Sequence, residues 1–265
     1  MGSRSFQEIT GYRRLDELNE RLLGFSTRTL KEDCLDLPEK IYIKRSVPLT
    51  AEQTKLYAQM KKYALAQLEG GQLATTASVL TQIMRLQQIC CGYLMSDEGE
   101  LKILNNNRMT ELLAAVEECS GKVIIWCNYT HDIKEIEKAL SSKYGGDSVA
   151  TYYGATKQED RQATVDKFQD INSPLRFFVG QPKTGGYGIT LTAANTMIYY
   201  SNSYDLEIRL QSEDRAHRIG QKKAVTYIDL IVEDTIDEKI VKSLREKIDL
   251  AGQVLGEEQK RWLLN

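Results

Sequence analysis

The chain has 265 residues, of which 42% are apolar and 27% charged, enough for one large core or for a core domain with a helical appendage. No apolar run approaches the roughly 18 residues that span a bilayer, and no basic segment leads into an apolar one as in a secretory signal. We therefore expect no membrane partner. The net charge of −2 gives a nucleic-acid function no support, so any such function must rest on motifs.

The spacing of the cysteines and histidines indicates no metal-binding site among them. Five cysteines include the adjacent pair Cys90 and Cys91 but no Cys-x-x-Cys, and His131 lies far from His217 in the sequence. Because no zinc spacing can be written from these residues, we expect no metal ligands among them. The cysteines are typical of small buried thiols in a reducing compartment.

The first hundred residues are predicted to be mainly helical. In residues 40–47, Ile41 and Ile43 alternate with charged neighbours, which predicts a half-buried edge strand. Turn residues with little periodicity at 96–106 mark a boundary. We therefore assign residues 1–104 to a linker and a helical protrusion with an edge strand near 40–47. The expected helices cover residues 14–25, 51–69 and 75–94.

From about residue 105 onward, β-rich apolar runs alternate with helix-like stretches. This alternation predicts right-handed βαβ units, and hence a doubly wound parallel sheet with helices on both faces. The resulting α/β domain covers residues 105–250, and residues 251–265 form a C-terminal tail. The expected strands are residues 122–127, 148–153, 175–180, 196–201 and 225–232.

The segment QSEDRAHRIGQ, residues 211–221, gathers donors that suit a phosphate. A helix over residues 205–219, capped by Ser203 or Asp205 and stopped by Gly220, would place Gln211, Arg215 and Arg218 on one face. Asp214 would lie one turn before Arg218 and hold it. A solvated, salt-bridged helix is the plain alternative. Position favours the phosphate, because the segment follows a predicted strand and ligands bind at carboxyl ends of strands.

A glycine-rich loop, residues 181–195, precedes this segment. Gly185, Gly186 and Gly188 could let the backbone approach a phosphate or ribose, although a flexible strand-to-helix turn has the same composition. The chain has no phosphate-binding P-loop, and Asp97-Glu98 lies in a turn where it makes a poor magnesium site. Two arginines without a P-loop suit arginine fingers that reach a phosphate held by another domain.

These segments resemble a known family. QSEDRAHRIGQ is similar to motif six of the Swi/Snf-type ATPases, the helicase-like DNA translocases of superfamily two. TGGYGITLTAAN resembles their motif five, KVIIWCNYTHDI their motif four, and YYGATKQEDRQATVDKFQD the segment after it. TLKEDCLDLPEK and LTQIMRLQQIC resemble the linker and the helical protrusion. Thr184, Thr190 and Asn195 stand where the family usually has alanine, asparagine and aspartate.

The resemblance, which covers about residues 25 to 245, implies the second RecA-like lobe of a two-lobe motor. ATP would lie between the lobes, with its phosphates and magnesium held mainly by a first lobe that this chain lacks. Arg215 and Arg218 would be the catalytic residues that stabilise charge on the γ-phosphate. The expected nucleotide-binding residues are Gln211, Asp214, Gly186 and Gly188.

The same resemblance implies a surface that tracks DNA, expected to be double-stranded. Its residues would be Asn128, Tyr129, Gly154, Thr156, Lys183 and Thr184, which can contact phosphates without a basic domain. Plain alternatives exist for three of them. Asn128 and Tyr129 could form only a helix-entry turn, and Thr156 could cap a helix that begins at Lys157. We expect His217 to be packed, because the chemistry requires no imidazole.

Two functions follow from these observations. In the first, the chain is the C-terminal lobe of a DNA-dependent ATPase and is inactive without the first lobe. In the second, it is a stand-alone interaction module with the same fold and no enzymatic role, although such a module has no evident use for the arginines. We expect a cytoplasmic protein of a bacterium or a virus-infected cell, or a nuclear protein if the source is eukaryotic.

Overall fold

The computed structural model describes residues 13–27, 34–69, 76–96, 98–185 and 188–254. The chain divides into two compact units, residues 37–244 and the combined terminal segments 1–36 and 245–265. In the terminal unit, helix α1 (Leu15–Leu23) carries an ion pair between Arg21 and Glu17 at 2.6 Å. Most of the tail expected from residue 251, namely residues 255–265, lies outside the described residues.

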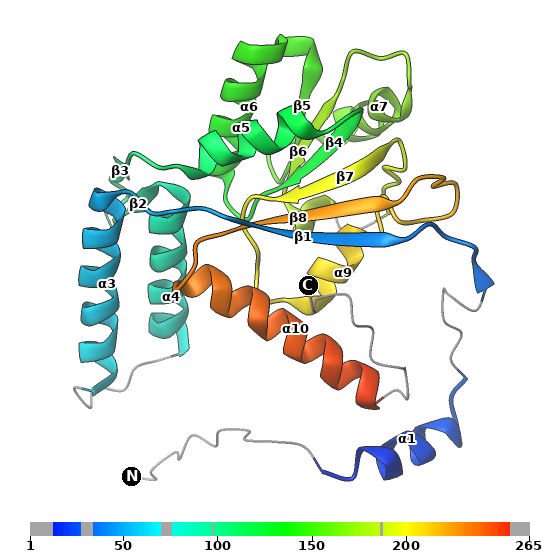
Figure 1. The fold of residues 1–265 in the computed structure, drawn as a ribbon, viewed down its shortest axis with the longest axis horizontal. Coiled ribbons are helices and arrows are strands. Elements are labelled where there is room, and N and C mark those ends of the chain that lie inside the picture. Colours follow the sequence, from blue (N-terminus) through cyan, green and yellow to red (C-terminus); the bar gives the residue numbers. More distant parts are fainter. Residues whose placement is uncertain (1–12, 28–33, 70–75, 97, 186–187, 255–265) are drawn as a thin grey trace. The chain divides into compact units, whose positions relative to one another are not determined.

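The larger unit is built on a six-stranded sheet in which every neighbouring pair of strands is parallel. Its strand order is β1-β8-β7-β4-β6-β5 (Figure 1). The predicted parallel sheet is confirmed. The strands are β1 (Lys40–Ser46), β4 (Lys122–Trp126), β5 (Val149–Tyr152), β6 (Phe177–Gly180), β7 (Ala194–Tyr199) and β8 (Val225–Ile231).

Strand β1 lies at the edge of this sheet, as predicted. The face that it half-buries differs from the expectation, because Ile41 and Ile43 are exposed whereas Lys40 and Tyr42 are partly buried. It pairs with β8 over its whole length, from Lys40 opposite Val225 to Ser46 opposite Ile231. The chain therefore contributes a strand from its first fifty residues to the sheet that residues 122–231 otherwise form.

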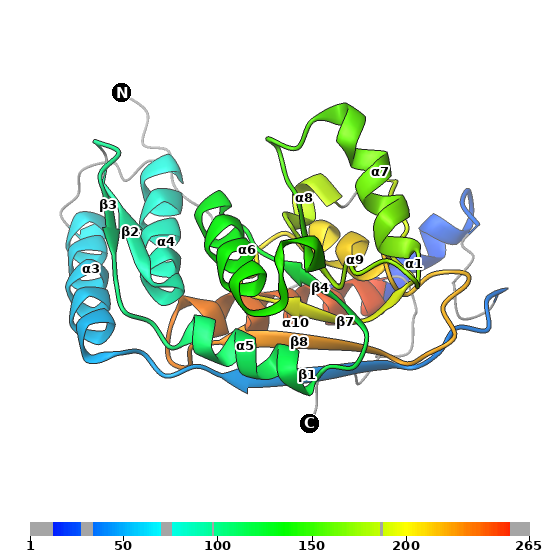
Figure 2. The same ribbon diagram turned by 90° about the horizontal axis from the view of Figure 1, so that it is seen from above.

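Helices cover both faces of the sheet, because β4 is apolar on both sides. Val123 and Ile125 pack in one cluster with α5 (Arg108–Glu118) and α6 (Thr130–Tyr144). Ile124 and Trp126 pack in a second cluster with α7 (Gln158–Gln169). Figure 2 shows α5 and α7 on opposite sides of the strands. The doubly wound arrangement is therefore confirmed.

Further helical elements connect or follow these strands. The short α8 (Pro182–Gly185) follows β6, and α9 (Leu206–Glu213) packs on the second cluster through Tyr199. Helix α10 (Ile236–Val254) follows β8 and packs its first turns into the first cluster. A 3-10 turn, η1 (Gly146–Ser148), joins α6 to β5.

The protrusion consists of α3 (Ala51–Glu69), α4 (Thr76–Cys91) and a hairpin of β2 (Tyr93–Met95) and β3 (Leu101–Ile103). It lies where β8 leads into α10, at the carboxyl end of the sheet (Figure 1). The helix expected over residues 75–94 ends earlier. Gly92 has a φ of +97°, and a Cβ there would lie 2.1 Å from the Asn106 side chain. The turn requires glycine, so the helix stops at Cys91 and a strand begins.

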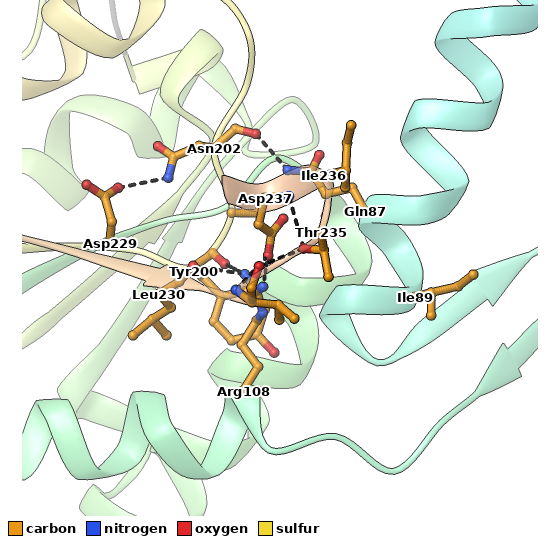
Figure 3. Close-up of polar contacts among 12 residues, drawn as sticks. Gln87, Ile89, Arg108, Tyr200, Asn202, Asp229, Leu230, Thr235, Ile236 and Asp237 are labelled. Carbon is orange, nitrogen blue, oxygen red and sulfur yellow. Dashed lines mark hydrogen bonds and ion pairs between the residues drawn. The ribbon is translucent and has the colours of Figure 1, made fainter. Parts of the chain in front are cut away.

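A buried arginine holds the carboxyl end of the sheet together. Arg108, at the start of α5, has no exposed surface and contacts the carboxylate of Asp237 in α10. It also donates hydrogen bonds to the backbone oxygens of Tyr200, just after β7, and Leu230 in β8 (Figure 3). One guanidinium thus fastens two strands and two helices.

Asp132 in the first turn of α6 is buried beside this ion pair. Burial raises the pKa of its carboxyl to about 8, against the charge of Arg108 and a hydrogen bond with the Cys91 thiol, which lower it. The negative charge of Asp237 nearby also raises the pKa of Asp132. The folded protein therefore keeps Asp132 protonated at neutral pH, whereas an exposed aspartate ionises near pH 3.9.

The change Asp132→Asn should make folding less sensitive to pH. Between about pH 4 and pH 8 the folded wild type binds a proton that the unfolded chain releases, so its stability falls as pH rises, by at most about 1.4 kcal/mol per pH unit. Asparagine stays neutral throughout. In urea unfolding, the stability of the variant relative to the wild type should rise from pH 5 to pH 8, and a constant difference would contradict the assignment.

Candidate nucleotide and nucleic-acid site

Helix α9 carries the chain from one end of the sheet to the other. The Asp205 carboxylate caps its start by accepting a hydrogen bond from the Ile208 amide at 3.2 Å. Beyond its end, the Arg215 carbonyl accepts from the Leu191 amide at 2.8 Å, just before β7 begins at Ala194. The arginine segment therefore lies at the amino ends of the strands, and our expectation of a carboxyl-end position is wrong.

The prediction of a helix over residues 205–219 is also wrong for the second half of this range. It ends at Glu213, and residues 214–220 form turns. Hydrogen bonds from outside the helix explain the difference. The Gln221 side-chain amide donates to the carbonyls of Thr192 at 3.1 Å and Ala194 at 2.9 Å, which draws the chain toward β7. Helical spacing therefore does not align Gln211, Asp214 and the two arginines on one face. We call residues 214–220 the arginine turn.

The two arginines have different surroundings. Arg215 is half-buried, and its Nε donates to the Gln211 carbonyl at 2.8 Å while its Nη1 donates to the Ile189 carbonyl at 3.2 Å. Arg218 is exposed. Neither guanidinium forms an ion pair within the described part of the chain. Arg215 thus fixes the turn, whereas Arg218 projects from it.

The charges at the turn favour an anion. Burial and then the positive charge of Arg218 lower the pKa of the Arg215 guanidinium, against the carboxylate of Asp214, which raises it. The Arg215 guanidinium nevertheless remains charged at neutral pH, because arginine is not deprotonated in proteins. Two cations that repel each other gain energy when an anion neutralises them.

The other expected nucleotide-binding residues lie near this turn. Gln211 is half-buried and donates to the Glu207 carboxylate at 2.8 Å, and Asp214 forms the C-cap of α9. Gly188, with a φ of +76°, precedes the residue whose carbonyl binds Arg215. This φ favours glycine for the chain's own conformation. Gly186 lies outside the described residues.

Four of the expected DNA-binding residues meet at the opposite end of the sheet. The neighbouring strands β6, β4 and β7 end there, and a hollow of about 340 Å³ lies between these ends and α4. Asn128, Tyr129, Lys183 and Thr184 line it, whereas Gly154 and Thr156 follow β5 and do not.

Several of these side chains already have partners within the chain. The Tyr129 hydroxyl donates to Gln87 Oε1 at 2.7 Å, and burial raises the pKa of this tyrosine. Tyr129 is also the N-cap of α6, so the predicted helix-entry turn is present. Thr156 Oγ1 accepts from the Tyr153 amide at 3.0 Å. Because Lys157 caps α7, the alternative role of Thr156 as its N-cap is wrong.

A buried ionic group that the sequence pattern did not predict lies behind α9. Arg209 pairs with Glu213 at 2.9 Å and Asp229 of β8 at 2.6 Å, and it stacks 3.5 Å above the Tyr199 ring. It also donates to the Asn202 side chain at 2.6 Å. The spacing of four between Arg209 and Glu213 was a visible signal. No local pattern could show Asp229, because it belongs to a distant strand.

His217 is buried, as expected. Its Nε2 donates to the Pro38 carbonyl at 2.7 Å, just before β1. The histidine therefore holds the arginine turn against the segment that leads into the edge strand.

Comparisons with known proteins identify the family. Residues 105–220 match the model of the helicase conserved C-terminal domain, and residues 4–94 match that of the SNF2-related domain. The chain belongs to the SNF2-type family of helicase superfamily two. The predicted resemblance of the chain to that family is thus confirmed. No helix within the described ranges is long and apolar enough to cross a membrane.

Two relatives show how much of a SNF2-type protein the chain covers. It is 32% identical over 258 residues to the Bacillus subtilis protein YwqA, described as an ATP-dependent helicase/translocase, covering 93% of this chain and 27% of that protein. It is 30% identical to the SWI/SNF chromatin-remodeling complex subunit snf22 of Schizosaccharomyces pombe, covering 91% and 15%. The chain thus spans about a quarter of the first relative and less of the second.

Solved structures support the RecA-like fold. The Sulfolobus solfataricus SWI2/SNF2 ATPase core in complex with dsDNA superposes with a TM-score of 0.64 and 26% identity, covering 90% of this chain and 53% of that one. The C-terminal part of the Fun30 ATPase domain gives a TM-score of 0.66 with 21% identity, covering 78% and 90%. The second likeness shows the fold alone.

Removing the Arg209 guanidinium should strongly destabilise the fold. In Arg209→Met the carboxylates of Asp229 and Glu213 stay buried without this cation, which typically costs about 3–5 kcal/mol. Chemical unfolding measures the loss. The double change Arg209→Met with Asp229→Asn should lose less than the sum of the single changes, since it also removes one unpaired charge. Additive losses would show that the two residues act independently.

Proposed function

We propose that the chain is the C-terminal helicase lobe of a SNF2-type DNA-dependent ATPase and translocase, and that it requires a first lobe for ATP hydrolysis. The exposed guanidinium of Arg218 carries this proposal. It stands on a turn that buried contacts hold in place, beside a second cation and without an ion pair in the described chain. Such a cation is arranged to meet an anion from outside the lobe.

Arg218 would contact the γ-phosphate, and Arg215 would hold the turn in place. The two carbonyls bonded by Arg215 belong to α9 and to the segment before β7, so it joins motif six to motif five. This fixed arrangement needs little reorganisation as charge develops, which is the source of electrostatic catalysis. Bound ATP supplies the phosphoryl group. The guanidiniums fit phosphate oxygens but not magnesium, and the chain has no P-loop, so a first lobe would hold the metal.

The hollow at the other end of the sheet would contact a DNA backbone. Lys183 is exposed at its rim, Thr184 and Asn128 add polar groups, and none of the described residues that line it is acidic. Such groups suit phosphates, which fix register without reading sequence. Gly154 and Thr156 would extend this surface beyond β5. The relative with 26% identity is described as bound to dsDNA, which supports a duplex as substrate.

The segment between β6 and β7 would link the two ends. It begins at Gln181 beside the hollow and reaches Ile189 and Leu191, which bond Arg215. A change in nucleotide state at the arginine turn could therefore shift Lys183 and Thr184 through one continuous stretch of chain.

The alternative function, a non-catalytic interaction module, leaves Arg218 without a role. It would require that removing the arginine change no enzymatic activity of the full protein. The following experiment therefore separates the two functions.

In the two-lobe protein, Arg218→Ala should lower the turnover number for DNA-stimulated ATP hydrolysis by about 10³-fold or more, because an arginine finger contributes that much to phosphoryl transfer. Its melting temperature should not change, since the side chain is exposed. The control is Lys222→Ala, which removes a nearby exposed cation and should keep full turnover. Normal turnover in Arg218→Ala would end the finger assignment and favour the interaction module.

Lys183→Ala should weaken DNA binding in a salt-dependent way. Losing one phosphate contact should reduce the slope of log affinity against log salt by about 1, and equally for different sequences. Fluorescence anisotropy of a labelled duplex at several salt concentrations measures this slope in the two-lobe protein. Lys242→Ala, an exposed lysine on α10, is the control. If both variants keep the wild-type slope, Lys183 does not contact DNA.

A further inference from the structure

Strand β1 is attached to the helix that carries the arginine turn. Lys40 Nζ lies 3.1 Å from Glu213 Oε2, and the Tyr42 hydroxyl donates to the same oxygen at 2.8 Å. Glu213 is the last residue of α9 and lies two positions before Arg215. The edge strand therefore holds α9 at the point from which the arginine turn projects.

The backbone before β1 holds the other side of the turn. The Pro38 carbonyl accepts from His217, the residue just before Arg218, and the Glu39 carbonyl accepts from the Val225 amide of β8. Residues 38–42 thus contact Glu213 just before the arginine turn and His217 within it. Residues 29–40, which lead into β1, resemble the linker of the Swi/Snf-type family. We take this linker to connect the two lobes.

These contacts are partly buried, and they meet at the fully buried carboxylate of Glu213. Glu213 has no exposed surface, and Lys40 is the cation that pairs with it from β1, as Arg209 does from its own helix. Burial raises the pKa of Glu213, but the charges of Lys40 and Arg209 outweigh burial and lower this pKa below its usual range. Tyr42 stacks on Tyr227 of β8 with ring centroids 4.9 Å apart, which fixes its hydroxyl. Moving β1 would separate the partly buried Lys40 from the buried carboxylate of Glu213, so we expect α9 to follow it.

We infer that Lys40 and Tyr42 are positioning residues for the arginine finger, acting through Glu213, and that β1 couples the linker to the arginine turn. The inference rests on the proposed function. When the cleft opens or closes, a pull on residues 37–39 would reach Arg218 through Glu213 and His217. Strand β1 and the residues before it would then help to position the nucleotide site.

The strand itself offers a matched control. Lys44 follows Lys40 and Tyr42 on the same face of β1, since alternate residues share a face. Its Nζ pairs with Glu238 of α10 at 3.2 Å and with Glu233 at 3.7 Å. Removing Lys44 therefore takes the same charge from the same strand without touching α9.

The test compares Lys40→Met, Tyr42→Phe and Lys44→Met in the two-lobe protein, with Arg218→Ala in the same assay. Lys40→Met and Tyr42→Phe should each lower the turnover number for ATP about tenfold and leave the KM for ATP within twofold, because the finger acts in the transition state. Lys40→Arg, which keeps the cation, should restore turnover. Lys44→Met should match the wild type. Tyr42→Phe retains the ring and its stacking, so it provides a measurement if Lys40→Met fails to fold.

The outcomes separate the two proposals. Normal turnover in Tyr42→Phe and Lys40→Met, while Arg218→Ala is inactive, would overturn only the role of β1. Equal losses in Lys40→Met and Lys44→Met would also overturn it, because the effect would then follow charge or stability rather than contact with Glu213. Normal turnover in Arg218→Ala would instead remove the proposed function on which the inference rests.

Discussion

The ionic group around Arg209 determines where the arginine turn lies. Its guanidinium joins Glu213 at the end of α9 to Asp229 in β8 and stacks on Tyr199 in β7. Burying these charges costs desolvation energy, and the contacts offset that cost only in one geometry. The helix is therefore held on the sheet in a single position. The arginine turn begins one residue after Glu213, so its location follows from this contact.

The parallel sheet separates two kinds of chemistry at its two ends. The carboxyl ends of β6, β4 and β7 open onto a polar hollow beside α4, while the arginine turn lies at the amino ends of β7 and β8. Two stretches of chain span the distance, α9 and the segment between β6 and β7. A hydrogen-bonded series also runs from Arg209 through Asn202 to Gln87 and Tyr129, which borders the hollow. Figure 3 shows the contact between Asn202 and Gln87 in this series. Helix α9 and this hydrogen-bonded series thus connect the proposed nucleotide and DNA surfaces.

The sequence pattern predicted the features that depend on neighbouring residues. The apolar run at 122–127 indicated a strand of a parallel sheet that helices cover on both faces, and the alternation at Ile41 and Ile43 indicated an edge strand. The spacing of motif six, read as a helix, misplaced the arginines, because the side chain of Gln221 binds carbonyls near β7 and ends the helical path. Lys40 and Glu213, 173 residues apart, carried no local signal at all. Contacts between distant segments decided both features.

The account depends on Arg218 meeting a phosphate that another lobe holds. The most direct test is a structure of the two-lobe protein with DNA and a transition-state analogue, ADP with aluminium fluoride. The account predicts that the Arg218 guanidinium lies within about 3 Å of the fluoride group, as charge-assisted hydrogen bonds do. It also predicts that Arg215 keeps its bonds to the carbonyls of Gln211 and Ile189. A closed cleft in which Arg218 instead points into solvent or pairs with a carboxylate of its own lobe would contradict it.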